Sequence, residues 1–227
     1  MTQFFRQAWT IAAKDLRSEL RNKEAMNAAL SFSVVVLLLF SLAFDPNENP
    51  DVKDLAGGLL WIVYLFAGIL LLNRSFARES ANDCMEALVA APISGAAIFA
   101  GKVVANSVLL LLLEITSLPV FGVFYNINWT PRLPLLLLVF FLGTWAFAAV
   151  GTIFSAITAN HRLRELMLPL LVFPIMVPAM MAAVQLTVLI LTGEPIADSM
   201  IWLKLLLGVD VIFTLLGGVL LELVLVG

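Results

Sequence analysis

The pattern of apolar and polar positions divides the chain into long apolar runs separated by short polar connections. Six runs are each close to the roughly 20 residues that an α-helix needs to cross a bilayer. We place these runs at residues 26–44, 55–73, 97–125, 133–158, 166–192 and 202–226. Charged residues, prolines and glycines bound each run, as is typical of membrane helices joined by loops. The pattern therefore predicts an all-α integral membrane protein with six transmembrane helices.

Residues 3–23, ahead of the first run, show a different pattern. Apolar side chains recur there at spacings of four and three, which predicts one face of a helix: Phe5, Trp9, Ala12, Leu16 and Leu20. The opposite face is charged and carries Arg6, Lys14, Asp15, Arg17, Glu19 and Arg21. A signal peptide is the competing interpretation, but no small-residue cleavage site follows the first apolar run. We therefore expect an interfacial helix that lies along the membrane surface.

Composition agrees with this pattern and limits what else the chain contains. Of its 227 residues, 62% are hydrophobic and only 13% are charged, whereas about a quarter of a soluble domain is charged. Six crossings use about 120 residues, so we expect a single transmembrane domain over residues 1–227. The net charge of −3 excludes a nucleic-acid binder that depends on a basic surface. Cys84 is the only cysteine, which excludes an intrachain disulfide.

Basic residues are concentrated on one side of the predicted membrane. If both termini share a side, that side holds ten of the 13 Lys and Arg residues: Arg6, Lys14, Arg17, Arg21, Lys23, Arg74, Arg78, Lys102, Arg162 and Arg164. The other side holds only Lys53, Arg132 and Lys204. Because cytoplasmic loops carry the excess of Lys and Arg in membrane proteins, both termini are predicted to be cytoplasmic.

The longest cytoplasmic connection, residues 74–96, contains a predicted amphipathic helix over residues 80–91. Ser80 and Asp83 have the spacing of a capping box, and Pro92 ends the pattern. The helix has an apolar stripe (Cys84, Met85, Leu88, Val89) flanked by charged residues (Arg78, Glu79, Asp83, Glu86). Such a stripe fits a groove on a soluble partner, but it equally fits a helix that rests on lipid or packs beneath the bundle.

No nucleotide-binding motif accompanies this connection. Gly95 and Gly101–Lys102 are separated by five residues instead of the four of a phosphate loop, and Val103 replaces the Ser or Thr that binds magnesium. We therefore expect a non-catalytic chain, with any ATP hydrolysis carried out by another subunit.

Two acids interrupt the apolar runs. Glu114 falls near the predicted bilayer midplane, and Asp210 lies one to two turns inside the last run. An ionised acid at that depth costs at least ~2.5 kcal/mol, so each must be protonated, paired or facing a polar cavity. A proton relay or subunit contact and a contact between helices are equally compatible with the sequence. A stand-alone proton-coupled secondary carrier that uses Glu114 and Asp210 is therefore the alternative function.

Pro169, Pro174 and Pro178 interrupt the fifth run, and each removes a backbone donor. We expect this helix to be kinked or broken into short pieces, which makes it a candidate flexing element, although a static kink explains the prolines as well. His161, the only histidine, stands beside Arg162 and Arg164 in a short turn. Neighbouring cations disfavour metal binding, so we favour a solvated histidine over a metal or haem ligand.

Two segments together are similar to the haem exporter protein B (CcmB) family. The first is the cytoplasmic connection, with Ser75, Arg78, Glu79, Asp83, Met85, Glu86, Leu88, Pro92, Gly101, Lys102 and Val103. The second is the proline-rich fifth run, with Leu168, Pro169, Phe173, Pro174, Ile175, Val177 and Pro178. Length, six spans and cytoplasmic termini also agree with this family, so the resemblance covers essentially the whole chain.

This resemblance implies an ABC-2-type permease subunit of the cytochrome c maturation transporter in the bacterial cytoplasmic membrane. It implies two copies of the chain with a cytosolic ATPase (CcmA), the membrane subunits CcmC and CcmD, and release of the haem-loaded chaperone CcmE. The helix at residues 80–91 would then be the coupling helix. No cofactor is assigned to this chain, because ATP belongs to the ATPase and haem is handled by the complex. A purely structural assembly subunit is the third alternative.

Overall fold

The computed structural model describes residues 2–46, 52–76, 93–159, 161–194 and 199–226. Its elements are α1 (Thr2–Asn22), α2 (Glu24–Phe44), α3 (Val52–Leu72), α6 (Gly95–Phe124), a 3₁₀ turn η1 (Thr130–Arg132), α7 (Leu133–Thr158), α8 (Arg164–Thr192) and α9 (Met200–Val226). In the described part of the chain, six helices are long and apolar enough to cross a membrane. Their bounds agree with the six predicted runs to within three residues, so the all-α membrane fold is confirmed.

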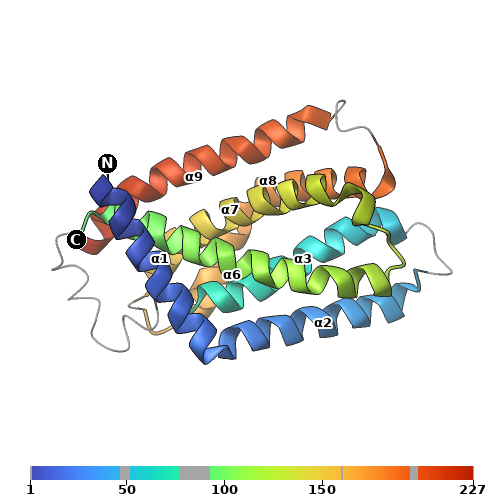
Figure 1. The fold of residues 1–227 in the computed structure, drawn as a ribbon, viewed down its shortest axis with the longest axis horizontal. Coiled ribbons are helices and arrows are strands. Elements are labelled where there is room, and N and C mark those ends of the chain that lie inside the picture. Colours follow the sequence, from blue (N-terminus) through green and yellow to red (C-terminus); the bar gives the residue numbers. More distant parts are fainter. Residues whose placement is uncertain (1, 47–51, 77–92, 160, 195–198, 227) are drawn as a thin grey trace.

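The six long helices run alongside one another, and α1 lies across one end of the bundle (Figure 1). Both chain termini are at that end, which we call the terminal end (Figure 1). The helices α2 and α9 lie at opposite edges of the bundle and are its least buried spans, whereas α3 and α7 are the most buried. Lipid-facing leucines and valines therefore concentrate on the two edge helices, as in the case of Leu42 and Leu215.

Glycines let the central helices approach one another closely. A Cβ atom on Gly143 would lie 2.3 Å from the ring of Trp61, and one on Gly151 would lie 2.4 Å from Leu72. Both glycines belong to α7, and both large side chains belong to α3. Small residues serve membrane helices in this way because lipid supplies no hydrophobic force that would bring the helices together.

Of the two expectations for the fifth span, a break into short pieces is wrong, and a kink stays a prediction. Helix α8 is one α-helix from Arg164 to Thr192, with Pro169, Pro174 and Pro178 inside it. A proline removes a single backbone donor, and a membrane bundle tolerates the loss because neighbouring groups re-satisfy the freed carbonyls.

The far end of α8 is capped by a side chain from the connection before α7. Gly193 ends the helix with a left-handed backbone (φ 99°). The guanidinium group of Arg132 donates to the carbonyls of Ile190 and Gly193, each at 3.0 Å. A cation at the C-terminus of a helix also offsets the negative end of the helix dipole. Arg132 is thus held at this end of the bundle by α8.

Helix α1 turns sharply into α2 at Lys23, which has a left-handed backbone (φ 52°). The two-faced pattern expected for α1 is incomplete. Its buried side holds Ile11, Ala12 and the acid Glu19, while Phe5 and Trp9 are each 67% exposed. The burial follows from packing against α6, which gives the helix a third face that periodicity does not show. Within the predicted apolar stripe, Phe5, Trp9 and Leu20 therefore face outward, whereas Ala12 is buried.

Candidate functional site

The residues proposed for ATPase coupling fall in the segment 77–92. Arg78, Glu79, Asp83, Met85, Glu86 and Leu88 therefore lie outside the described residues, as does the whole helix predicted at residues 80–91. The structure does describe both ends of this connection, up to Phe76 and from Ile93 onward. The geometry of these two ends shows how the connection is attached to the bundle.

The first end of the connection is attached to a buried lysine. Lys102, in the second turn of α6, is fully buried, and its Nζ donates to the carbonyl oxygen of Ser75 at 2.6 Å. The same Nζ lies 3.1 Å from Oδ2 of Asp15 in α1 and 4.2 Å from the ring centre of Phe76. An ammonium group so far from water needs several such partners. Lys102 therefore links α1, α6 and the start of the connection, and we call this group the Lys102 cluster.

A second polar residue of α6 continues this attachment one turn deeper. The side-chain amide of Asn106 donates to the hydroxyl of Ser75 at 3.1 Å and to that of Thr152 in α7 at 2.9 Å. Nearby, the hydroxyl of Ser155 in α7 donates to the carbonyl of Leu72 at 3.0 Å. These hydrogen bonds join the end of α3 to α6 and α7. Together with the Lys102 cluster, they attach the start of the connection to α1, α6 and α7.

The acid of the Lys102 cluster also contacts a cation at the surface. Asp15 lies 3.0 Å from Nζ of Lys14, through its other carboxylate oxygen. Its side chain is 18% exposed, whereas that of Lys102 is not exposed at all. Asp15 therefore has water and a second cation nearby, while Lys102 depends on the cluster for its stability.

Close backbone packing holds α1 against α6 beside the cluster. A Cβ atom on Gly101 would lie 2.6 Å from the carbonyl oxygen of Ala8 and 2.8 Å from the side chain of Ile11. Only glycine fits this position without displacing the backbone of α1. Gly101, the residue before Lys102, thus lets α1 approach closely enough for Asp15 to reach Lys102.

The second end of the connection is attached to a different helix. Ser94 caps α6 by accepting a hydrogen bond from the backbone N–H of Ala97. A Cβ atom on Gly95 would lie 2.6 Å from the Cα atom of Glu222 in α9. The return of the connection to the bundle is therefore packed on the last turns of α9.

Glu114 lies in the bundle interior, as its sequence position predicts. Its side chain is 3% exposed, and Oε1 accepts a hydrogen bond of 2.6 Å from the Thr144 hydroxyl of α7. Within the described residues, Oε2 has no hydrogen-bond partner. The contact with Thr144 joins α6 to α7, as a contact between helices requires; a role in proton transfer stays a prediction.

Aromatic residues of α3 surround the next turn of α6. The Tyr64 hydroxyl lies 3.3 Å from the Glu114 carbonyl and from the Ser117 hydroxyl. The ring of Tyr64 meets those of Trp61 and Phe140 edge to face. Trp61 also donates to the Thr187 hydroxyl of α8 at 2.8 Å. This polar and aromatic cluster joins α3, α6, α7 and α8 at the centre of the bundle.

Asp210 lies in a groove between α7 and α9. The groove has a volume of about 440 Å³ and is lined by Phe141, Leu142, Trp145, Asp210, Val211, Thr214 and Leu215. Asp210 is 7% exposed, and its Oδ1 has no hydrogen-bond partner among the described residues. The neighbouring Thr214 hydroxyl accepts from Trp145 at 2.9 Å. Asp210 and Glu114 thus have separate surroundings, and no hydrogen bond between them occurs in the described chain.

The other sequence candidates are placed apart from these clusters. His161 is exposed in the turn before α8, where Arg162, Arg164 and Glu165 line a hollow of about 590 Å³. The described residues contain no group of three His, Cys, Asp or Glu side chains with the arrangement of a metal site.

Comparison with known proteins decides the family. The family model described as CcmB protein matches residues 6–220. The chain belongs to the CcmB family. Curated relatives named heme exporter protein B include that of Paracoccus denitrificans, 31% identical over 74% of this chain and 76% of its own length. Those of Pseudomonas aeruginosa (27% identical; 90% of this chain and 91% of its own length) and Rhodobacter capsulatus (28%; 78% and 80%) are also similar. Membership of the CcmB family confirms the resemblance seen in the sequence.

Sequence reasoning missed several residues that the fold brings together. The sequence pattern places Asp15 on the charged face of the interfacial helix and predicts no contact for Ser75 and Asn106, yet all three belong to the Lys102 cluster or its extension. A lysine and an asparagine one turn apart at the start of an apolar run were the available signal, because both need partners when buried. The identity of those partners depends on contacts between distant segments.

Proposed function

We propose that this chain is the permease subunit of an ABC transporter for cytochrome c biogenesis. ATP hydrolysis on a cytosolic partner would move the bundle and thereby release or export haem or a haem-loaded chaperone. Membership of the CcmB family and the name of its relatives, heme exporter protein B, support this proposal. The observation that carries the coupling step is the buried Lys102, which attaches the start of the connection to α1 and α6.

The terminal end of the bundle is assigned to the cytoplasm, and the protein to the bacterial cytoplasmic membrane. The ten-to-three distribution of basic residues supports this orientation. Arg132, one of the three on the other side, is bonded to carbonyls at the end of α8. Arg132 lies at the end of α8 because it caps that helix, so its position is weak evidence against a cytoplasmic terminal end.

The proposed assembly contains the partners that the family resemblance implies. A second copy of this chain and a CcmA-like ATPase form its core, with CcmC-like and CcmD-like membrane subunits and a CcmE-like haem chaperone. ATP is bound by the ATPase, and haem is handled by the assembly. No cofactor site is assigned to this chain.

In the proposed mechanism, the segment 77–92 docks on the ATPase through Met85 and Leu88. Movement of this segment acts on Ser75 and Phe76, and thus on Lys102. Because Lys102 is bonded to both Ser75 and Asp15, the movement reaches α6 directly and α1 through Asp15. Asn106 passes the same movement to α7 through Thr152.

Replacing Met85 and Leu88 together by Glu tests the docking step. We expect the ATPase to be lost from purified membranes, because two charges would enter an apolar groove. The matched control is Leu163→Glu, which introduces a charge at a 62% exposed leucine in the turn before α8. Full retention of the ATPase by the double variant would refute the coupling-helix assignment.

The alternative is a proton-coupled carrier that acts alone. The specific observation in its favour is that Glu114 and Asp210 each have a buried carboxylate oxygen without a hydrogen-bond partner in the described residues. Proteoliposomes that contain only this chain and an internal pH dye distinguish the two functions. Proton flux that disappears in Glu114→Gln and Asp210→Asn would favour the carrier, whereas the permease is expected to show none.

A further inference from the structure

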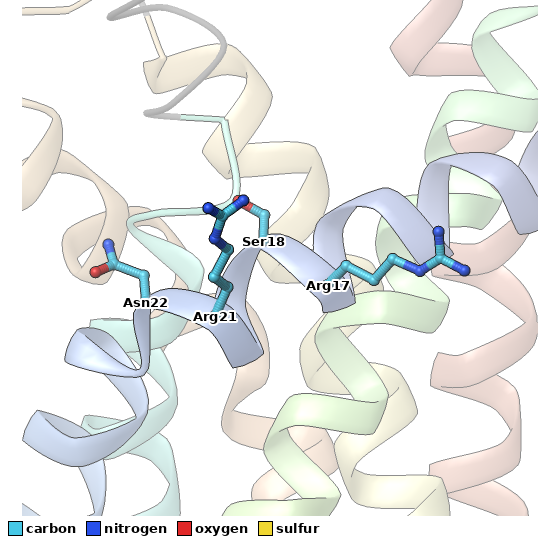
Figure 2. Close-up of a pocket in the computed structure, with 4 residues that line it drawn as sticks. All are labelled: Arg17, Ser18, Arg21 and Asn22. Atoms are coloured by element: carbon cyan, nitrogen blue, oxygen red, sulfur yellow. The ribbon is translucent and has the colours of Figure 1, made fainter.

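Two arginines on the outer side of α1 face a hollow that the bundle does not fill. Arg17, Ser18, Arg21 and Asn22 line this hollow, which has a volume of about 540 Å³ (Figure 2). All four come from the last turns of α1. In Figure 2, the Arg21 side chain rises beside Ser18, while Arg17 extends along the helix in the other direction. Two guanidinium groups are thus spread along one exposed edge.

These arginines have no partner in the described chain. Two other basic residues near the terminal end are paired: Lys102 with Asp15, and Arg74 with Glu24 at 2.9 Å. Arg17 and Arg21 are exposed and make no ion pair or hydrogen bond with a described residue. Their two charges are therefore not neutralised by any residue of the described chain.

Chain connectivity places these charges at the level of lipid headgroups. Arg21 precedes the first residue of α2, Glu24, by three positions, and Arg17 precedes it by seven. Seven residues of helix span only about 10 Å, and α1 lies across the end of the bundle rather than pointing away from it (Figure 1). The headgroup layer on each side of a bilayer is roughly 5–7 Å thick, so both guanidinium groups lie within or next to it.

An exposed apolar strip runs beside the arginines on the same helix. Phe5 and Trp9 are each 67% exposed and Leu20 is 50% exposed. On a helical projection this strip separates the buried side of α1 from the edge that carries Arg17. An apolar strip next to a basic edge is the arrangement by which a surface helix inserts its apolar side chains between lipids while its cations reach the phosphates.

We propose that Arg17 and Arg21 bind the phosphate group of an anionic phospholipid in the leaflet at the terminal end. Lipid accounts for both the apolar strip and the basic edge, because its acyl chains cover Phe5, Trp9 and Leu20 while its headgroup pairs with the arginines. An acidic soluble protein would account only for the charges. The second hollow at this end, near Arg162 and Arg164, includes the acid Glu165 among its lining residues, so it is less suited to an anion.

Native mass spectrometry of the full-length chain in detergent tests this proposal without any partner protein. The chain is titrated with phosphatidylglycerol or, for comparison, with phosphatidylcholine. Arg17→Gln/Arg21→Gln is expected to bind phosphatidylglycerol about thirtyfold more weakly than the wild type, as expected for the loss of two basic residues at an anionic surface. Phosphatidylcholine binding is expected to stay unchanged. Arg17→Lys/Arg21→Lys keeps the charges and should retain most of the affinity.

The matched control is Arg162→Gln/Arg164→Gln, which removes the same charge from the neighbouring turn. It should bind phosphatidylglycerol as the wild type does. An equal loss of phosphatidylglycerol affinity in this control would overturn the proposal, because any two positive charges at this end would then have the same effect. Unchanged binding by Arg17→Gln/Arg21→Gln would overturn it as well, and so would displacement of the lipid by soluble glycerol phosphate. In a separate co-purification with the ATPase, loss of ATPase binding by Arg17→Gln/Arg21→Gln with phosphatidylglycerol binding intact would assign these arginines to a protein partner instead.

Discussion

The Nζ atom of Lys102 lies 2.6 Å from the carbonyl oxygen of Ser75, 27 positions earlier in the chain. These two residues stand on opposite sides of the segment 77–92, so their hydrogen bond closes the base of that connection. The same lysine is paired with Asp15 of α1, which makes it the point where the connection, α1 and α6 meet. Its substitution is therefore the most direct test of how the bundle is held together at the terminal end.

Removing Asp15 is expected to destabilise the protein more than removing Lys102. Asp15→Ala removes a carboxylate partner from a fully buried ammonium group, and breaking a buried pair in this way costs about 3–5 kcal/mol. Lys102→Met leaves a carboxylate that is partly exposed and also lies 3.0 Å from Lys14. Melting temperatures of the detergent-solubilised variants measure the difference. The double variant should lose less than the sum of the single losses; simple additivity would show that the pair does not interact.

Alanine at Gly101 and at Gly208 should have effects of opposite sign. Replacing a helical glycine by alanine normally stabilises a helix by about 1 kcal/mol. A Cβ atom on Gly208 would meet nothing within 4 Å, so Gly208→Ala should follow this rule. On Gly101 it would lie 2.6 Å from the backbone of Ala8, which forces α1 away from α6. Thermal unfolding of both variants in one detergent compares them; a stabilised Gly101→Ala would contradict the observed packing.

Glu114→Gln separates a contact between helices from proton transfer. The amide oxygen of Gln still accepts the hydrogen bond from Thr144, so the melting temperature should change little. Glu114→Leu removes the acceptor and should lower stability by about 1 kcal/mol. If Glu114 acts only as a contact, cytochrome c maturation in cells that express the Gln variant equals that of the wild type. Lost maturation with an unchanged melting temperature would show a role in proton transfer.

Asp210→Leu is expected to stabilise the chain when it is purified alone. The buried Oδ1 of Asp210 has no hydrogen-bond partner in the part of the chain that the structure describes, which costs free energy in an apolar groove, and leucine removes that cost. Asp210→Asn, which keeps a polar group of the same size, is the matched control and should have a smaller effect. A lower melting temperature for the Leu variant would show that Asp210 has a stabilising partner within this chain.

Alanine at Pro169, Pro174 and Pro178 tests whether α8 flexes. The substitutions restore three backbone donors inside a continuous helix and should stiffen it. We expect the ATPase to remain bound while ATP-dependent maturation slows. Maturation at the wild-type rate in the triple variant would indicate that the prolines are only accommodated by packing.

Hydropathy sufficed to predict the spans, because each apolar run must cover the bilayer by itself. The agreement extends to α7, whose predicted bounds, residues 133–158, equal the observed ones. The third face of α1 could not be predicted in this way, since Ile11 is buried against Gly101 of α6, 90 positions away. The same holds for Lys102 and Asp15, which are 87 positions apart. Sequence periodicity indicates which side of a helix is apolar, but the neighbour that covers it is a property of the whole bundle.

The close approach of Gly95 to Glu222 has a consequence for any partner that grips the segment 77–92. One end of that segment is bound to Lys102, which is paired with Asp15 of α1, and the other end packs on the final turns of α9. A displacement of the segment therefore acts on both attachments at once. The first and the last helix of the chain would then respond together to an event that touches neither of them.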